Sequence, residues 1–106
     1  MKQGDKAQLT VKKYLRKEYM KSLGDLECTV IRYDAKEACV YLILENKELT
    51  AASLDIIYGC EVLSEDEKLT FTGRIKERYY SDLGKVLKVE IENGFYKISI
   101  NRVDKQ

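Results

Sequence analysis

From residue 26 onward, apolar side chains recur at every second position, and this alternation constrains the fold more than any other feature of the chain. A period of two places successive side chains on opposite faces of a β-strand. Runs of this kind, separated by turn-forming residues, occur at about six places in residues 26–102, and no helical crossover fits between them. The sequence therefore predicts a mainly β, antiparallel protein.

An open, flat sheet of six strands would leave two strand edges exposed. Closure into a small six-stranded antiparallel barrel removes both edges, and a compact two-sheet sandwich is the alternative. The chain has no Pro, a residue that often protects edge strands, and this favours closure. Because 106 residues suit a single domain, we expect residues 1–106 to form one domain with 26–102 as its barrel.

The N-terminal part follows a different period. Val11, Leu15, Tyr19 and Leu23 recur at every fourth position, and Gly24 follows where a left-handed C-terminal residue is expected. This spacing predicts a short helix over residues 9–23, which would cap one mouth of the barrel or pack against a partner chain. A short strand over residues 8–12 is the alternative.

Two turns stand out near the C-terminus. Asn93-Gly94 is the pair that best tolerates the positive φ angles of a type I′ turn, so it predicts a hairpin between strands 86–92 and 95–101. A second turn is expected over residues 81–84, from Ser81 to Gly84. Gly59, inside the alternating run 53–62, predicts a bulge or a sharp bend of that strand.

The residues that are missing exclude several chemistries. The chain has no His, which rules out a Ser-His-Asp triad, a Cys-His dyad and histidine metal ligands. Cys28, Cys39 and Cys60 show no metal-binding spacing and lie among apolar residues, so we expect small buried side chains in a reducing compartment. The acidic clusters fall in predicted loops. We therefore expect no catalytic residue, no metal and no cofactor, and a protein that is not an enzyme.

The formal net charge is only +1, which argues against general electrostatic capture of DNA. The charges are unevenly placed, because an acidic middle, residues 25–68, lies between basic ends. We see no signal peptide and no apolar run approaching the ~20 residues of a membrane span. The expected protein is soluble and cytoplasmic, with no membrane contact.

One predicted strand has a basic face. In a regular strand Arg74, Lys76 and Arg78 would all point to the same side, and guanidinium groups can grip phosphates in a bidentate manner. Tyr79 and Tyr80 follow directly and would add a stacking surface. These five residues are the candidate ligand-binding site. In the alternative interpretation they are ordinary surface residues that pair with Glu90 and Glu92 on the next strand.

The segment from Leu69 to Arg78 has the form apolar-x-F-x-G-x-apolar-x-x-R and contains an R-x-x-x-R segment, Arg74 to Arg78. With six expected strands, it resembles the PilZ domain, and in particular the N-terminal barrel of flagellar-brake PilZ proteins. The resemblance implies a bacterial signalling protein. PilZ proteins that bind cyclic di-GMP also carry a D/N-x-S-x-x-G motif, and Asp82-Leu83-Gly84 has neither its serine nor its spacing. The resemblance therefore implies the barrel more than the ligand.

These observations favour a non-catalytic regulatory or protein-interaction module, with a protein partner or a second copy of the chain as its target. The alternative is a barrel that binds a nucleotide or RNA through the basic strand, with a cyclic dinucleotide among the candidate ligands.

Overall fold

The computed structural model describes residues 1–15 and 24–99, with side chains as far as residue 94. Six strands account for most of this part, and one short 3-10 helix, η2, lies between the third and fourth strands. The elements are β1 (Lys6–Tyr14), β2 (Leu26–Asp34), β3 (Cys39–Leu44), η2 (Leu49–Ala51), β4 (Ile56–Ser64), β5 (Glu67–Ser81) and β6 (Gly84–Ser99).

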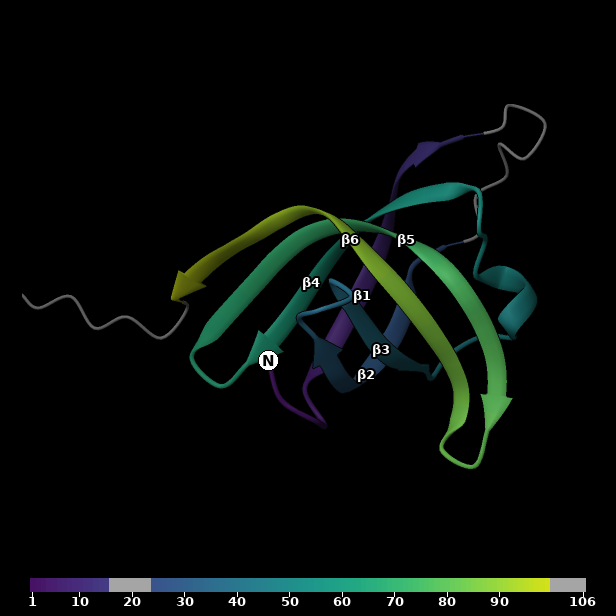
Figure 1. The fold of residues 1–106 in the computed structure, drawn as a ribbon, viewed down its shortest axis with the longest axis horizontal. Coiled ribbons are helices and arrows are strands. Elements are labelled where there is room, and N and C mark those ends of the chain that lie inside the picture. Colours follow the sequence, from purple (N-terminus) through teal and green to yellow (C-terminus); the bar gives the residue numbers. More distant parts are fainter. Residues whose placement is uncertain (16–23, 100–106) are drawn as a thin grey trace, which may run out of the picture.

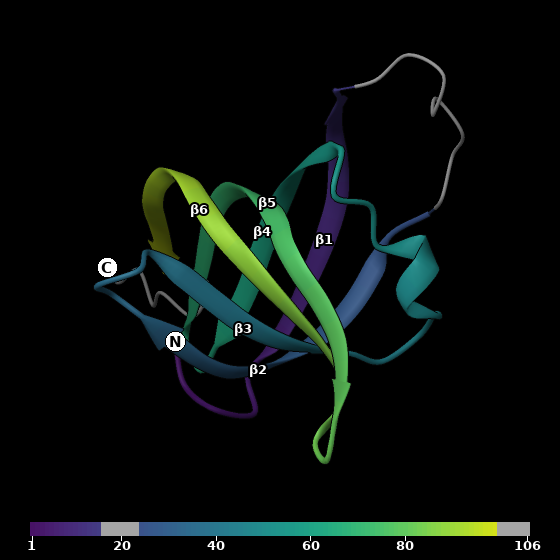
Figure 2. The same cartoon turned by 45° about the vertical axis from the view of Figure 1, so that its right-hand side comes forward.

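The strands form one closed barrel in the order β1-β2-β3-β6-β5-β4, with every neighbouring pair antiparallel (Figures 1 and 2). The mainly β, six-stranded prediction is confirmed, and the sheet closes on itself rather than splitting into a sandwich. β5 and β6 are the longest strands and arch over the barrel as one curved hairpin (Figure 1).

The helix predicted over residues 9–23 is wrong where the structure describes it. Lys6–Tyr14 is strand β1, which pairs with β2 on one side and β4 on the other. Ala7 and Leu9 are buried and alternate with exposed neighbours. β4 pairs with β1 along its whole length and β2 pairs with residues 6–9, and this tertiary gain outweighs local helix propensity. Residues 16–23 lie outside the described part of the chain.

The Asn93-Gly94 turn is also wrong, because β6 runs straight through it from Gly84 to Ser99. Asn93 pairs with Thr72, and the extra residues are taken up by register shifts between Thr70 and Gly73. The turn predicted at residues 81–84 is confirmed as the β5–β6 connection, and Gly84 there has φ +126. The sequence prediction counted β6 as two strands and missed β1, so its total of six strands is right although two of the strands are not.

Gly94 offers a direct test of that difference. Its φ is not positive, and an added Cβ would meet no atom within 4 Å. Gly94→Ala should therefore change the free energy of unfolding by less than about 0.5 kcal/mol, or raise it by restricting the unfolded chain. A type I′ turn would make the same change costly. Urea unfolding followed by tyrosine fluorescence measures the difference, and a loss well above 1 kcal/mol (on the order expected for a strained residue) would favour the turn.

The bulge predicted at Gly59 lies on the neighbouring strand instead. Gly59 is in regular register with both Thr10 and Thr72, whereas β1 contains an extra residue between Val11 and Lys13. That extra residue is Lys12, and its aliphatic stem lies directly over Gly59, where a Cβ would be only 2.7 Å from Lys12 Cε. Gly59 makes room for a neighbouring side chain rather than bending its own strand.

The barrel interior is filled by alternating apolar side chains from all six strands. Cys28, Cys39 and Cys60 are buried free thiols, as the sequence predicted. Burial raises the pKa of Cys28 from its ordinary value of 9.0 to about 12, and it raises the pKa of Cys60 as well. The thiols are therefore held in their neutral form, which makes them poor nucleophiles.

These raised pKa values predict that the protein loses stability in alkali. Above pH 9 the unfolded chain releases the Cys28 proton while the folded chain keeps it, so the stabilisation is complete below pH 9 and lost as the pH rises toward 12. For each such thiol, the free energy of unfolding should fall by about 1.4 kcal/mol per pH unit in that window. Urea unfolding at several alkaline pH values should give a shallower decline for Cys28→Ala than for the unmodified chain. Equal slopes for the two proteins would contradict a buried, neutral Cys28.

Candidate functional site

Every residue of the candidate ligand site lies on the outer half of the β5–β6 hairpin. The last residue of β5 that pairs with β4 is Gly73, opposite Tyr58, so residues 74–81 of β5 pair only with β6. We call residues 74–88 the hairpin arm. Figure 1 shows the arm at the lower right, where it reaches past the body of the barrel and ends in the turn before Gly84.

The basic residues of the arm do not share one face, which corrects the sequence prediction. Arg74 is paired with Glu90, but a register shift between Ile75 and Glu77 leaves Lys76 as an extra residue. After this bulge, Arg78 is paired with Leu87, which is fully buried. Directly opposed residues in an antiparallel pair lie on the same face, so Arg78 is on the inward face of the sheet. A bulge reverses the alternation that the spacing R-x-x-x-R implies.

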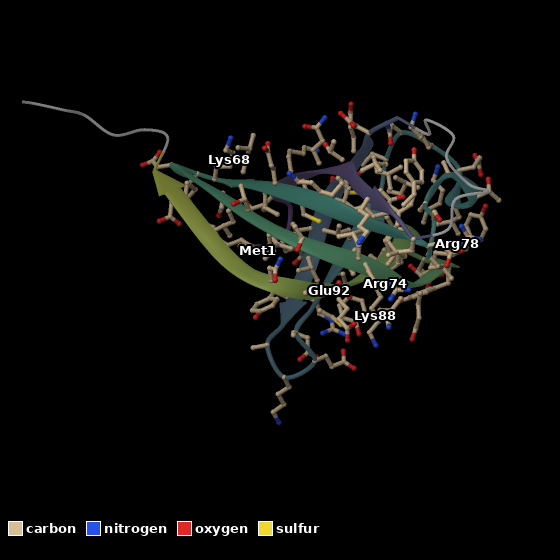
Figure 3. The ribbon with its side chains drawn as sticks, turned by 90° about the horizontal axis from the view of Figure 1, so that it is seen from above. Met1, Lys68, Arg74, Arg78, Lys88 and Glu92 are labelled. Atoms are coloured by element: carbon tan, nitrogen blue, oxygen red, sulfur yellow. The ribbon has the colours of Figure 1, made fainter. Side chains whose placement is uncertain are left out.

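Both arginines bind main-chain carbonyl groups of the segment between β3 and β4. Arg78 Nη1 donates to Ala52 O at 2.6 Å and to Leu49 O at 3.1 Å. Arg74 Nη2 donates to Leu54 O at 3.3 Å, and its Nε is buried with no hydrogen-bond partner among the described residues. Figure 3 shows the two arginines one after the other along β5. Their guanidinium groups hold the loop to the arm where β4 has already left β5.

Two further side chains of the arm attach the same loop. Lys85 Nζ donates to the carbonyl oxygen of Lys47, and the Tyr80 hydroxyl donates to Glu48 Oε1 at 3.4 Å. Beneath the loop, the fully buried Tyr58 accepts a hydrogen bond from the Ser53 amide at 3.1 Å. The segment 47–54 is therefore fastened at several points beside the part of β5 that does not pair with β4.

The remaining cations of the arm form ion pairs on the outer face. Lys76 Nζ lies 3.6 Å from Glu90 Oε1, which is the cross-strand pairing that the sequence offered as the alternative to a ligand site. Lys88 Nζ lies 3.4 Å from Glu37 and 3.8 Å from Glu77. The other three cations of the arm, Arg74, Arg78 and Lys85, contact neutral carbonyl groups rather than carboxylates.

What the arm does expose is apolar surface. Tyr79, Tyr80 and Leu83 are 40%, 69% and 57% exposed, and all three lie within five residues at the arm's tip. Tyr79 and Tyr80 were predicted as site residues. Leu83 was missed, although a leucine inside a predicted turn is the signal that would have found it, because turns are normally polar. Tyr79 and Tyr80 are consecutive in β5 and therefore lie on opposite faces of the arm, so its tip exposes apolar side chains on both faces. Exposed apolar side chains gathered at the end of a hairpin mark contact surfaces.

The surface also has two shallow hollows on the outer face of the sheet, away from the arm. The larger, about 500 Å³, spans β1, β4, β5 and β6 and is lined by Thr10, Lys12, Thr70, Thr72 and Asn93 among others. The smaller, about 360 Å³, lies beside it and contains Glu27, Glu45 and Glu61. Neither hollow contains any of the predicted site residues.

The described residues contain no group of His, Cys, Asp and Glu side chains arranged to hold a metal ion. In the same part of the chain no helix is long and apolar enough to cross a membrane. The chain matches no family model, and searches of curated proteins and of solved structures gave no match either. Its function therefore has to be inferred from the geometry of the hairpin arm.

Proposed function

We propose that this protein is a non-catalytic regulatory or protein-interaction module whose contact surface is the tip of the hairpin arm. The observation that carries the proposal is the joint exposure of Tyr79, Tyr80 and Leu83. Tyrosine is enriched at the centres of protein interfaces because it combines a large apolar area with a polar hydroxyl and few rotatable bonds. Two exposed tyrosines and a leucine at one tip suit a protein partner better than a small ligand.

The attachment of the arm supports the same proposal. The loop contacts made by Arg74, Arg78 and Lys85 hold the arm to the barrel, so its tip is presented in one conformation. A surface that is ordered before binding loses less conformational entropy when the partner arrives. The arginines therefore serve the interface indirectly, by positioning the strand that carries the tyrosines.

A PilZ-like architecture is part of the proposal. It is supported by the six-stranded barrel and by the Leu69–Arg78 segment, which spans the core of β5 and the start of the arm. In this proposal the missing D/N-x-S-x-x-G motif means that the module works without cyclic di-GMP. The geometry of Arg74 and Arg78 agrees, because donors that already bind carbonyl groups would have to release the loop to grip a phosphate.

The nucleotide or RNA alternative makes a contrasting prediction. We expect titration with cyclic di-GMP or a short RNA at low salt to give no affinity tighter than about millimolar, since Arg74 and Arg78 would have to release the loop carbonyl groups before they could bind a phosphate. NMR chemical shifts or fluorescence anisotropy would measure this. Tighter binding that is lost in Arg74→Ala and weakens with salt would favour the alternative function instead.

The proposed interface can be tested in the cells that produce the protein. A photo-cross-linking amino acid at position 80 should give a discrete protein adduct, and this adduct should disappear when Leu83→Ser is added. Leu63 is the matched control, because it is 49% exposed but belongs to β4. A cross-linker at position 63 should not give the adduct. If positions 63 and 80 give the same adducts, or position 80 gives none, the arm is not the contact surface.

A further inference from the structure

The second half of β6 has a strand partner on one side only. β3 pairs with β6 as far as Glu90, and the Ile91 amide then donates to Ala38 O at 2.8 Å. Beyond that point β6 continues to Ser99 while it pairs with β5 alone. Figure 1 shows this end of β6 curving away to the left, and Figure 3 shows it leaving the body of the barrel.

The two strands of the long hairpin, β5 and β6, differ in what lies beside their free edges. The outer half of β5 also lacks a strand partner on its second side, but the segment 47–54 is fastened beside it through the contacts of Arg74 and Arg78. Within the described residues nothing comparable covers β6 beyond Ile91, and Glu92, Asn93 and Gly94 are exposed. A loop of the same chain is therefore fastened beside the free edge of β5, whereas no described segment lies along the free edge of β6.

The sequence of the open edge is also suited to pairing. Residues 92–99 contain no Pro, and Phe95, Tyr96 and Ile98 are types that favour strands. Soluble proteins usually protect a free edge with Pro, with several charges or with a covering segment, because unpaired N–H and C=O groups recruit other strands. This segment carries a single acid, Glu92, and a single base, Lys97, so two copies of it bring no net charge together.

We propose that this edge, residues 92–99 of β6, pairs with the same edge of a second copy of the chain in an antiparallel arrangement. Antiparallel pairing of identical edges about a two-fold axis is self-complementary and closed, so it yields a dimer rather than a fibre. The sheet then runs from β4, β5 and β6 of one copy into β6, β5 and β4 of the other. Main-chain hydrogen bonds satisfy the open edge of both copies at once.

This dimer is independent of the function proposed for the hairpin arm. The arm tip lies at the opposite end of β6 from the open edge, so pairing leaves Tyr79, Tyr80 and Leu83 exposed in both copies (Figure 1). A dimer of this kind would present two arm tips to a partner. Either proposal can fail while the other holds.

Disulfide scanning tests the two-fold pairing directly. Single cysteines would be placed one at a time at positions 94 to 98, and mild oxidation would trap dimers. Cα atoms near the axis face their own symmetry copies, so cross-linking should peak at one or two alternate positions. The native cysteines do not interfere because all three are buried. Lys36→Cys, in the exposed β2–β3 turn, is the matched control and should not cross-link.

Hydrogen exchange and sedimentation velocity provide a test that needs no substitution. From micromolar to near-millimolar concentration the sedimenting mass should double. Those amides of residues 93–99 that face away from β5 should become protected over the same range, while those of β3 should not change. Two proline variants, Tyr96→Pro and Lys97→Pro, test which N–H groups matter. In a regular strand consecutive N–H groups point to opposite sides, so one variant removes an N–H from the open edge and the other removes one that faces β5. The variant that removes the open-edge N–H should fold and stay monomeric. A chain that remains monomeric throughout, with no gain of protection at the outward-facing amides of 93–99, would overturn the proposal.

Discussion

Replacing Arg78 with methionine should lower the free energy of unfolding by about 2 kcal/mol, because the hydrogen bonds of a charged donor contribute more than neutral ones. Methionine keeps much of the apolar stem but removes the donors that reach Leu49 O and Ala52 O. Leu49 and Ala52 are buried, so water cannot readily replace those donors. Leu49 O keeps the Ala52 amide as a partner, whereas Ala52 O has only Arg78 among the contacts found in the described residues.

Urea unfolding followed by tyrosine fluorescence measures the effect, since the chain has eight Tyr and no Trp. Arg78→Lys should recover part of the loss, because an ammonium group can reach a carbonyl but lacks the planar fork. Lys76→Met is the matched control: its ion pair with Glu90 is exposed, and such pairs contribute little. If Arg78→Met is as harmless as Lys76→Met, the loop is not held by the arginine. Hydrogen exchange in residues 49–55 would show the loosening directly.

Among the glycine-to-alanine substitutions, Gly73→Ala is expected to lower the free energy of unfolding the most. A Cβ there would lie 2.5 Å from Glu90 O and 2.9 Å from Val89 Cγ1, and the carbonyl belongs to the backbone of β6. Because a paired strand cannot move aside cheaply, Gly73→Ala should cost about 3 kcal/mol, at the upper end of what overpacking usually costs. The loss should appear in both chemical and thermal unfolding, with little change in the urea m-value.

Gly59→Ala is the control for Gly73→Ala, since both glycines occupy neighbouring positions on paired strands. The Cβ at Gly59 would meet only the side chain of Lys12, the nearest atom being Cε at 2.7 Å. That flexible chain can swing into solvent, so the expected cost is less than about 0.5 kcal/mol. Equal losses of stability at the two positions would show that the close approach of the β6 backbone to Gly73 does not set the cost of the substitution.

Local sequence patterns were enough to predict a strand wherever that strand buries only one face. The alternation at period two located β2, β4 and the inner half of β5, and it placed Cys28 and Cys60 in the interior. Cys39 was predicted to face inward as well, but it is buried on the outer face of β3, opposite Glu90. The turn before Gly84 was also predictable, because that position requires a positive φ, which glycine adopts without strain. These features depend on residues close together in the sequence.

The errors arose where contacts distant in the sequence decided the outcome. Residues 9–14 carry apolar side chains that suit either a helix or a strand, and pairing with β4 along this stretch, with β2 joining at Leu9, selected the strand. Asn93-Gly94 can form a tight turn, but β5 offered a continuous partner, so the pair was drawn into β6 instead. Turn propensity is worth less than the ladder hydrogen bonds and packing that a long strand gains.

The candidate site shows the same division. The sequence by itself determined which side chains the arm carries: two arginines, a lysine and two tyrosines within residues 74–80. Only the tertiary structure decided what they do. A bulge at Lys76 separates Arg74 from Arg78, and loop carbonyls 20 to 29 residues away take their hydrogen bonds. The hydrogen-bond donors of an arginine are a property of the residue itself. Which acceptors they bind depends on barrel closure, because only closure brings the loop beside the arm.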